Sequence, residues 1–210
     1  MCLSFLYLAQ GNLGHAMRVL DQGLALCRAS SYRVSLSTLA AGLGQAYALQ
    51  ERLAEGHALV EEAIEDDVRT GGLQASASRV ARLSEVCRLA GRSAAAGQYA
   101  RQALALARQL KERGSEAHAL YQLGAVQAHT DPPDVAQAEA HYQQALALAE
   151  ELGMRPLVAH CHAGLDTLYT RAGRWEQAPT ALTAALALYR AMAMTFCSSQ
   201  CSTAAMAPLS

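Results

Sequence analysis

A pair of adjacent apolar residues, the first small and the second large, recurs five times along this chain. The pairs are Gly23-Leu24, Ala63-Ile64, Ala103-Leu104, Ala145-Leu146 and Ala185-Leu186. Successive pairs are 40, 40, 42 and 40 residues apart. A fixed period of about 20 to 50 residues is typical of a solenoid, in which each unit buries its apolar face against its neighbours. The spacing therefore predicts one continuous stack of units, an architecture typical of binding scaffolds.

Composition favours helices over strands. Alanine makes up about a fifth of the 210 residues, whereas aromatic residues make up 5%. This composition is typical of closely packed helices and not of sheets rich in Val, Ile and Thr. We therefore expect an all-α fold.

Charge, hydropathy and cysteine content exclude several classes of function. The net charge is -1 and Arg is intermixed with Glu along the chain, so no basic stripe predicts nucleic-acid binding by this segment. No run reaches the roughly 18 apolar residues that span a bilayer. The six cysteines form no dense framework, which is typical of a reducing compartment. We expect a cytoplasmic chain without membrane contact.

Each small-large pair belongs to a longer pattern that predicts an α-helix. The pattern occupies positions i, i+4, i+7, i+8 and i+11, which share one helix face. The first unit carries it as Ala16, Leu20, Gly23, Leu24 and Cys27. We name the helix that contains this pattern helix B of each unit.

A second recurrent set precedes each helix B and predicts a partner, which we name helix A. A small or polar residue comes first, as Ser4, Gly44, Ser84, Gly124 and Asp166. Three residues later come Tyr7, Tyr47, Cys87, Gln127 and Tyr169. The small residue lets helix A approach helix B, and a ring one turn later fills the gap. Each unit is therefore predicted to be an antiparallel helical hairpin.

Glycine and proline mark the expected links and turns. Gly71-Gly72, Gly114 and Gly153 are expected between units. The two extra residues of the fourth unit fall at Asp-Pro-Pro-Asp, residues 131–134, which predicts an insertion in the turn from helix A to helix B. Pro156 is expected near the start of the last helix A, where no N–H is needed.

These residues resemble the tetratricopeptide repeat family, whose units carry the same small residue, aromatic residue and second-helix pattern. The period of about 40 exceeds the 34 residues of the standard unit. It is similar to the long repeats in the C-terminal part of large bacterial signalling ATPases, some linked to nucleotide cyclases and others to LuxR-type DNA-binding domains. Residues 136–189 carry most of this second likeness. The resemblance implies a right-handed α-solenoid of about five helical hairpins.

Two residues depart from the family pattern. Asp166 occupies a position that the family normally gives to Gly. Pro179 falls inside the last expected helix B, where an interior proline costs about 3 kcal/mol. We therefore expect the last hairpin to be weaker than the others.

The ends of the chain also depart from the repeat. Counting back from Tyr7, the first helix A would begin before Met1, and the periodicity stops after Met194. We expect a repeat domain over residues 1–194, with an incomplete first repeat, and an irregular tail over residues 195–210. These features predict a chain truncated from a larger protein, with a tail altered by a change of reading frame.

No catalytic, cofactor or metal site is predicted. The chain has no phosphate-binding loop and no Ser, His and acid set. In His160-Cys161-His162 the two imidazoles point about 200° apart on a helix, so ordinary packing is favoured over a metal site. The acid run Glu65-Asp66-Asp67 could meet a basic partner, but a solvated face is favoured.

The register instead predicts a partner-binding groove on the concave wall that helix A residues line. These residues face away from helix B, and they are Gln45, Ser78, Glu85, Arg88, His118, Tyr121, His129, His160, Thr167, Thr170 and Arg171. An exposed Tyr121 beside several imidazoles would grip a peptide. An ordinary polar groove without a ligand is the alternative.

We therefore expect a non-catalytic scaffold or sensor that binds a protein or peptide, or adjoining domains of a parent protein. The resemblance implies that binding restrains or releases a nucleotide-switch domain in that parent. A small-molecule receptor in the groove remains an alternative. In a third possibility the chain belongs to a cyclase or ATPase only through its parent's other domains, because nothing in these residues supports catalysis.

Overall fold

The computed structural model describes residues 12–30, 35–69 and 77–194, and in these residues the chain is helical without strands. The helices are α2 (Leu13–Ala29), α3 (Leu36–Leu49), α4 (Leu53–Arg69), α5 (Ala77–Leu89), α6 (Ser93–Gln109), α7 (Arg113–Ala128), α8 (Val135–Glu151), α9 (Arg155–Arg171) and α10 (Ala178–Ala191). The all-α prediction is confirmed. The irregular tail expected over residues 195–210 lies outside the described residues.

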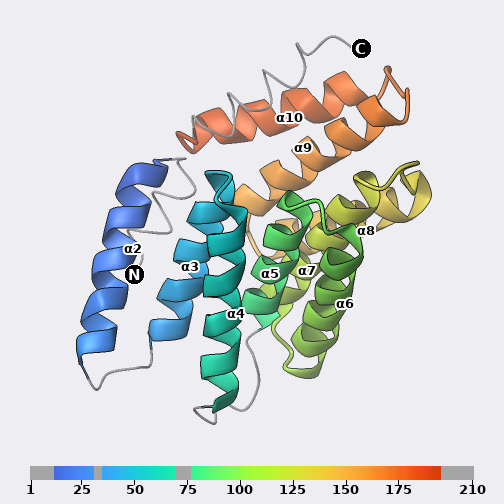
Figure 1. Cartoon of the computed structure of the whole chain (residues 1–210). Coiled ribbons are helices and arrows are strands. Elements are labelled where there is room, and N and C mark those ends of the chain that lie inside the picture. The colour runs from blue at the N-terminus through green and yellow to red at the C-terminus, as the bar shows by residue number, and fades with distance from the viewer. Residues whose placement is uncertain (1–11, 31–34, 70–76, 195–210) are drawn as a thin grey trace.

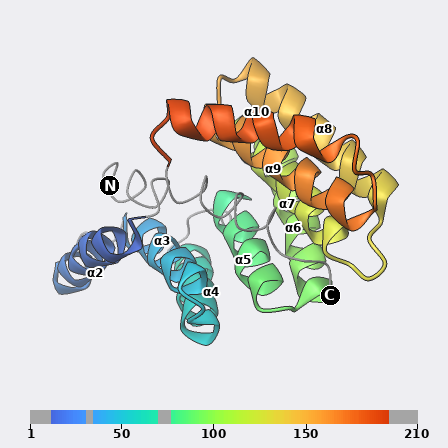
Figure 2. The ribbon, with the colours of Figure 1, turned by 90° about the horizontal axis from the view of Figure 1, so that it is seen from above.

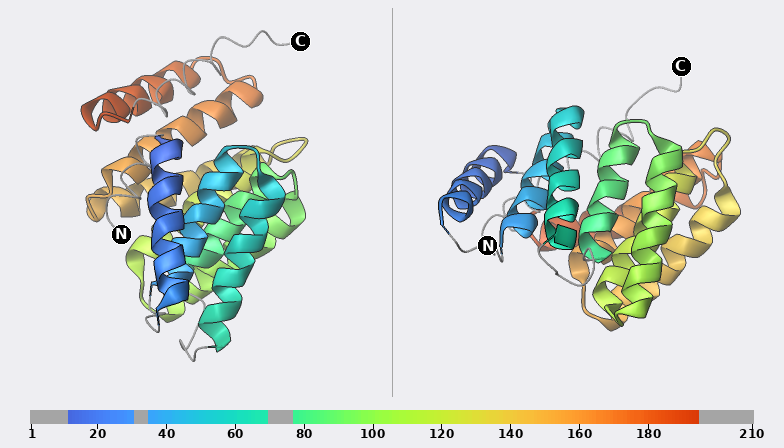
Figure 3. Two further views of the ribbon diagram at one scale, coloured as in Figure 1. Left: turned by 60° about the vertical axis from the view of Figure 1, so that its left-hand side comes forward. Right: turned by 60° about the horizontal axis from the view of Figure 1, so that its bottom comes forward.

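The helices form hairpins that stack in chain order from α2 to α10 (Figure 1). α3 with α4, α5 with α6, α7 with α8 and α9 with α10 are the predicted pairs of helix A and helix B. α2 is helix B of the first unit, and its expected partner falls in residues 1–11, outside the described part. Helices A of neighbouring units also contact one another, as α3 with α5, α5 with α7, and α7 with α9. Figures 2 and 3 show the resulting row of helices from further sides.

The recurrent pairs lie where helix B meets its neighbours. Ala63, Ala103, Ala145 and Ala185 are each fully buried. The larger members that follow them are partly buried at the edge of the same contacts. Burial of the small member lets two helix backbones come close, and the large member seals the side of the contact.

Small residues also set the distance between helix A and helix B. A Cβ added at Gly44 on α3 would lie 2.7 Å from the backbone oxygen of Gly56 on α4. In the next hairpin, Ser84 Oγ donates a hydrogen bond of 2.8 Å to the backbone oxygen of Ala96. The predicted close approach is therefore present in both hairpins, once through glycine and once through a hydroxyl.

Tyr142 of α8 fills a space that two glycines leave open. A Cβ at Gly124 on α7 would lie 2.9 Å from Tyr142 Cδ1, and a Cβ at Gly164 on α9 would lie 2.6 Å from Cε1 and Cζ. Tyr142 is 1% exposed and packs in the core that joins the last two hairpins. The ring therefore fixes α8 against both α7 and α9.

Left-handed residues end several of the helices. Glu51, Gly91 and Gly173 have positive φ at turns from helix A to helix B. Gly153 has positive φ between the fourth and fifth units, as expected. In the preceding link, however, Lys111 has the positive φ, whereas Gly114 lies inside α7, so Gly114 was wrongly placed. Gly71-Gly72 lies outside the described residues.

The two prolines of the last hairpin both lie in first turns. Pro156 is in the first turn of α9, as predicted. Pro179 was expected inside a helix, but α10 begins at Ala178, so Pro179 also needs no N–H there. The chain avoids the cost of an interior proline by starting α10 late, which leaves it 14 residues long where α8 has 17.

We predict that Gly164→Ala destabilises the protein by about 1–3 kcal/mol, because the added methyl group overlaps the Tyr142 ring. The matched control is Gly14→Ala on α2, where a Cβ meets nothing within 4 Å. That substitution should raise the free energy of unfolding by up to about 1 kcal/mol through helix propensity. Urea unfolding followed by circular dichroism measures both. Equal stability of the two variants would contradict this account of Tyr142.

Candidate interaction surface

Side chains of α3, α5, α7 and α9 that face away from helix B form one surface, which we name the helix A surface. Its register repeats from unit to unit, so Thr38, Ser78, His118 and His160 hold equivalent positions. Hydrogen bonds and ring contacts between these neighbouring helices place their side chains together. Most of the predicted residues fall into three groups along this surface. Thr167 lies outside them, and its hydroxyl donates to Ala163 of its own helix.

The first group joins α3 to α5. Gln45 Nε2 donates a hydrogen bond of 2.8 Å to Glu85 Oε2, so the structure brings these two predicted residues together. Arg82 Nη1 donates to Gln45 Oε1, and Arg79 Nη1 donates to Thr38 Oγ1 at 3.4 Å. Burial lowers the pKa of Arg82, and the charge of Glu85 acts in the opposite direction. This group is therefore a polar network in which the carboxylate of Glu85 lies near the guanidinium of Arg82.

Sequence analysis missed four members of this surface, Thr38, Arg79, Arg82 and Gln122. Arg82 lies one turn after Ser78, and Gln122 lies one turn after His118. Thr38 is equivalent to His118 in the unit two repeats earlier. The four-residue step of a helix was therefore the signal that could have found Arg82 and Gln122. Gln122 is 5% exposed, and its Oε1 accepts no hydrogen bond from the described residues.

The second group is aromatic and joins α7, α8, α9 and α10. The Tyr121 ring lies 5.8 Å from the Tyr142 ring and 6.2 Å from the His160 ring, centroid to centroid. His160 Nδ1 lies 2.7 Å from the hydroxyl of Tyr189. Tyr121 was expected as an exposed aromatic, but it is half-buried, because its ring completes the core between two hairpins. Tyr121 and His160 therefore connect the surface to the core.

His118 is the accessible member beside this group. Its side chain is exposed, whereas His160 is half-buried. Protein atoms on one side of the ring still desolvate it, which lowers the pKa of His118, and the charge of Arg82 adds to the effect. Burial likewise lowers the pKa of His160 to about 4, and His118 contributes. A lowered pKa favours the uncharged form of both imidazoles.

The third group lies at the C-terminal ends of α5, α7 and α9. It contains Arg88, His129 and Arg171, three predicted residues from three successive units. Burial lowers the pKa of His129, a hydrogen bond to Ala125 opposes this, and the charges of Arg88 and Arg171 add to the lowering. The two arginines are therefore close enough to act electrostatically on one imidazole.

The two other clusters considered in the sequence have different surroundings. Cys161 is fully buried, and the Nδ1 of neighbouring His160 lies against the hydroxyl of Tyr189. In the described residues, no three His, Cys, Asp or Glu side chains gather as metal ligands do. Asp66 was expected on a solvated face, but it is 3% exposed, because it turns toward the protein while Glu65 remains exposed.

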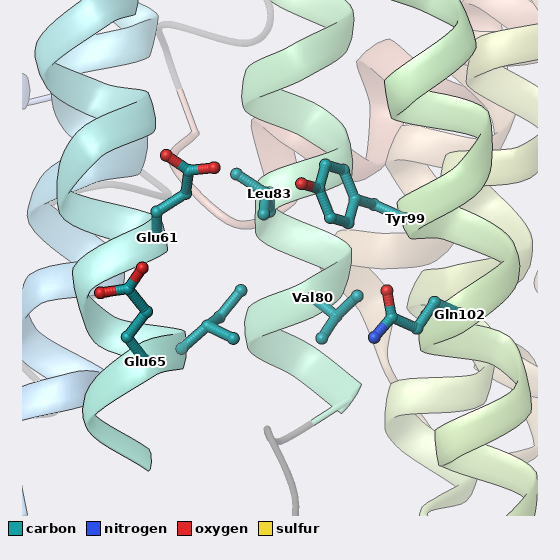
Figure 4. Close-up of a pocket in the computed structure, with 7 residues that line it drawn as sticks. Glu61, Glu65, Val80, Leu83, Tyr99 and Gln102 are labelled. Atoms are coloured by element: carbon teal, nitrogen blue, oxygen red, sulfur yellow. The ribbon is translucent and has the colours of Figure 1, made fainter. Parts of the chain in front are cut away.

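A pocket lies away from the helix A surface, between α4, α5 and α6 (Figure 4). Its volume is about 150 Å³, and Ile64, Val80 and Leu83 form its apolar part. Glu61 and Glu65 stand on one side, and Tyr99 and Gln102 on the other (Figure 4). The small-molecule alternative expected a ligand among the helix A residues, and this pocket is in a different place.

We predict that stability falls as the pH decreases from about 6.5 to 4, with His160 contributing. An unfolded histidine takes up a proton near pH 6.5, but folded His160 does so only near pH 4, so protons favour the unfolded state in this window. His160→Gln should flatten the curve of unfolding free energy against pH, by at most about 1.4 kcal/mol per pH unit. Urea unfolding at several pH values measures this slope. His15→Gln on exposed α2 is the control, and equal flattening by both variants would contradict the assignment.

Comparison with known proteins identifies the fold. No family model and no curated protein matches this chain. Solved structures do: a Rap protein complexed with Competence and Sporulation Factor has a TM-score of 0.76 at 15% identity, over 90% of this chain and 52% of that chain. BtubC from P. vanneervenii gives 0.60 at 19% identity, over 90% and 78% of the two chains.

A third similar structure contains TPR-like repeats. A kinesin light chain of Podosopora anserina with nearly identical TPR-like repeats gives a TM-score of 0.54 at 20% identity, over 89% of this chain and 91% of that chain. This chain spans about half the length of the Rap protein that it matches. No described helix is long and apolar enough to cross a membrane. The three similar structures show that the chain has the fold of a tetratricopeptide-type helical repeat, an α-solenoid of antiparallel hairpins.

Proposed function

We propose that this chain is a non-catalytic scaffold that binds a peptide or protein segment on its helix A surface. One observation carries the proposal. The hairpins bury the face between helix A and helix B, and the opposite face of each helix A adds polar side chains to a single surface that crosses four units. Such a surface can contact several consecutive residues of an extended partner.

The solved structures support the same function at the level of fold. The Rap protein whose structure resembles this chain was solved in complex with Competence and Sporulation Factor. Repeat folds of this kind act through extended surfaces and not through enclosed catalytic clefts. We therefore propose binding, and not a reaction, as the activity of these residues.

A regulatory role within a larger protein is the finer proposal. The likeness of residues 136–189 to the repeats of bacterial signalling ATPases supports it. In that setting, a partner on the helix A surface would restrain or release an adjoining nucleotide-switch domain. The reducing cytoplasm suits this role, since Cys27, Cys87 and Cys161 are free thiols.

Selection from a library of random twelve-residue peptides displayed on phage tests the scaffold proposal. Selected peptides should bind the whole chain in solution, as measured by fluorescence anisotropy. Gln45→Ala combined with His118→Ala should weaken them at least about tenfold, because both side chains belong to the helix A surface. Tyr121 and His160 are unsuitable for this test because their rings support the core.

The matched control removes the same residue types from helices B. Gln102→Ala combined with His15→Ala changes exposed side chains on α6 and α2, and it should leave the affinity within about twofold. Failure to recover any binding peptide, or equal losses in both double variants, would count against the helix A surface. A rise in melting temperature with a small metabolite, without peptide binding, would favour the receptor alternative.

A further inference from the structure

The pocket between α4, α5 and α6 lies away from the helix A surface, where helices B of the second and third units flank helix A of the third (Figure 4). Its volume of about 150 Å³ is well below the roughly 300–1,000 Å³ of sites that bind drug-sized molecules. The carboxylates at its rim are exposed, so the pocket opens to solvent. Its size and its open rim therefore suit a single side chain of a larger partner.

The floor of the pocket is apolar and belongs to the packed core. Val80 and Leu83 of α5 are 1% and 2% exposed, and Ile64 of α4 is half-buried beside them. Ile64 and Tyr99 pack against both buried clusters to which Val80 and Leu83 belong. Packed neighbours hold these side chains in place, so the floor is preformed. It can accept the methylene chain of a long polar side chain, which thereby leaves water.

Two carboxylates border this floor on the α4 side. Glu61 and Glu65 are one helix turn apart and therefore share a face of α4. His57 Nδ1 lies 3.1 Å from Glu61 Oε2, and a histidine is charged only when it is protonated. Of the described residues that line the pocket, none is a lysine, an arginine or a histidine. The rim is therefore negatively charged, and a positively charged ligand would complement it.

Tyr99 faces the carboxylates from α6, and Figure 4 shows its hydroxyl directed toward the side on which Glu61 lies. Its ring is half-buried. An aromatic ring attracts a cation, most favourably when the cation is partly desolvated. A guanidinium is planar, stacks on aromatic rings and is less strongly hydrated than an ammonium group. The ring therefore favours an arginine over a lysine as the occupant of the pocket.

We propose that this pocket binds an arginine side chain of a partner protein. The methylene chain lies on Val80 and Leu83, and the guanidinium donates hydrogen bonds to the carboxylates of Glu61 and Glu65. Such charge-assisted hydrogen bonds are stronger than those between neutral groups. The proposal goes beyond the scaffold function, because the pocket shares no residue with the helix A surface. It adds a second binding surface, on the helix B side of the second and third units.

Three capped heptapeptides test the chemistry of the ligand. They have the sequence Gly-Ser-Gly-X-Gly-Ser-Gly, where X is arginine, lysine or citrulline, which keeps the shape of arginine and lacks its charge. Each is titrated into the whole chain and followed by NMR of the backbone amides, which detects the weak binding expected of one side chain. The arginine peptide should shift amides that line the pocket and bind at least about tenfold more tightly than the citrulline peptide. It should bind about threefold more tightly than the lysine peptide.

Variants of α4 locate the site. Glu61→Gln combined with Glu65→Gln should weaken the arginine peptide at least about tenfold, and the fold should be retained because both side chains are exposed. The matched control is Glu55→Gln combined with Glu62→Gln, which removes the same charge from the same helix. Both of these carboxylates are exposed and lie outside the pocket lining, so the affinity should stay within about twofold.

Equal losses in the two double variants would overturn the pocket and indicate a general effect of negative charge on α4. Equal binding of the arginine and citrulline peptides, or no binding of either, would overturn it as well. Tighter binding of the lysine peptide would overturn the assignment of arginine. Gln45→Ala combined with His118→Ala should leave binding of the arginine peptide unaffected, because both residues lie on the helix A surface. Failure of this proposal would therefore leave the scaffold proposal intact.

Discussion

The close contact between helix A and helix B at one small residue per hairpin is the constraint on which the rest of the fold depends. At Gly44 the backbone of α4 occupies the place of a side chain, and at Ser84 a hydroxyl bonds the facing backbone directly. Helices that approach this closely lose the freedom to rotate against each other, because any rotation would bring a larger residue into the contact. The contact therefore fixes which face of helix A is buried. It follows that the same contact fixes which face remains for a partner.

The fourth and fifth hairpins use the same principle in a more demanding form. Tyr142 passes between Gly124 and Gly164, so one ring from α8 determines the spacing of three helices. Tyr121 and His160 then pack against this ring system from the side of the helix A surface, and Tyr189 continues the contacts to α10. A change of packing in the core would therefore move side chains on the surface. In this part of the chain, the stability of the solenoid and the shape of its interaction surface are inseparable.

Periodicity predicted the fold well because a repeat fixes both the helix faces and their order. The positions of α3 to α10, the buried alanines and the insertion before α8 all follow from a register of about 40 residues. Local chemistry was less predictable. Periodicity does not predict that α10 starts one turn late, and this late start places Pro179 in a first turn. Nor does it predict that Lys111 adopts the positive φ that was expected of a glycine. Tyr121 was assigned to the correct helix face, but its burial depends on Tyr142, a residue of another helix. Register therefore assigns a direction to each side chain, whereas its surroundings depend on the sizes of neighbours that lie far away in sequence.

Electrostatics was the property least accessible from the sequence. Arginine and glutamate are intermixed along the chain, and the net charge is close to zero, so no basic stripe was expected. In the fold, Arg79, Arg82 and Arg88 of α5 and Arg171 of α9 belong to the helix A surface, whereas α4 carries a row of carboxylates. Linear charge patterns are informative only when consecutive residues share a surface, and in a helical repeat they do not. Residues 40 or so positions apart share a surface instead. Arg88, His129 and Arg171 are each about one repeat from the next and lie at the C-terminal ends of α5, α7 and α9, so charge in a solenoid is best counted along the repeat register.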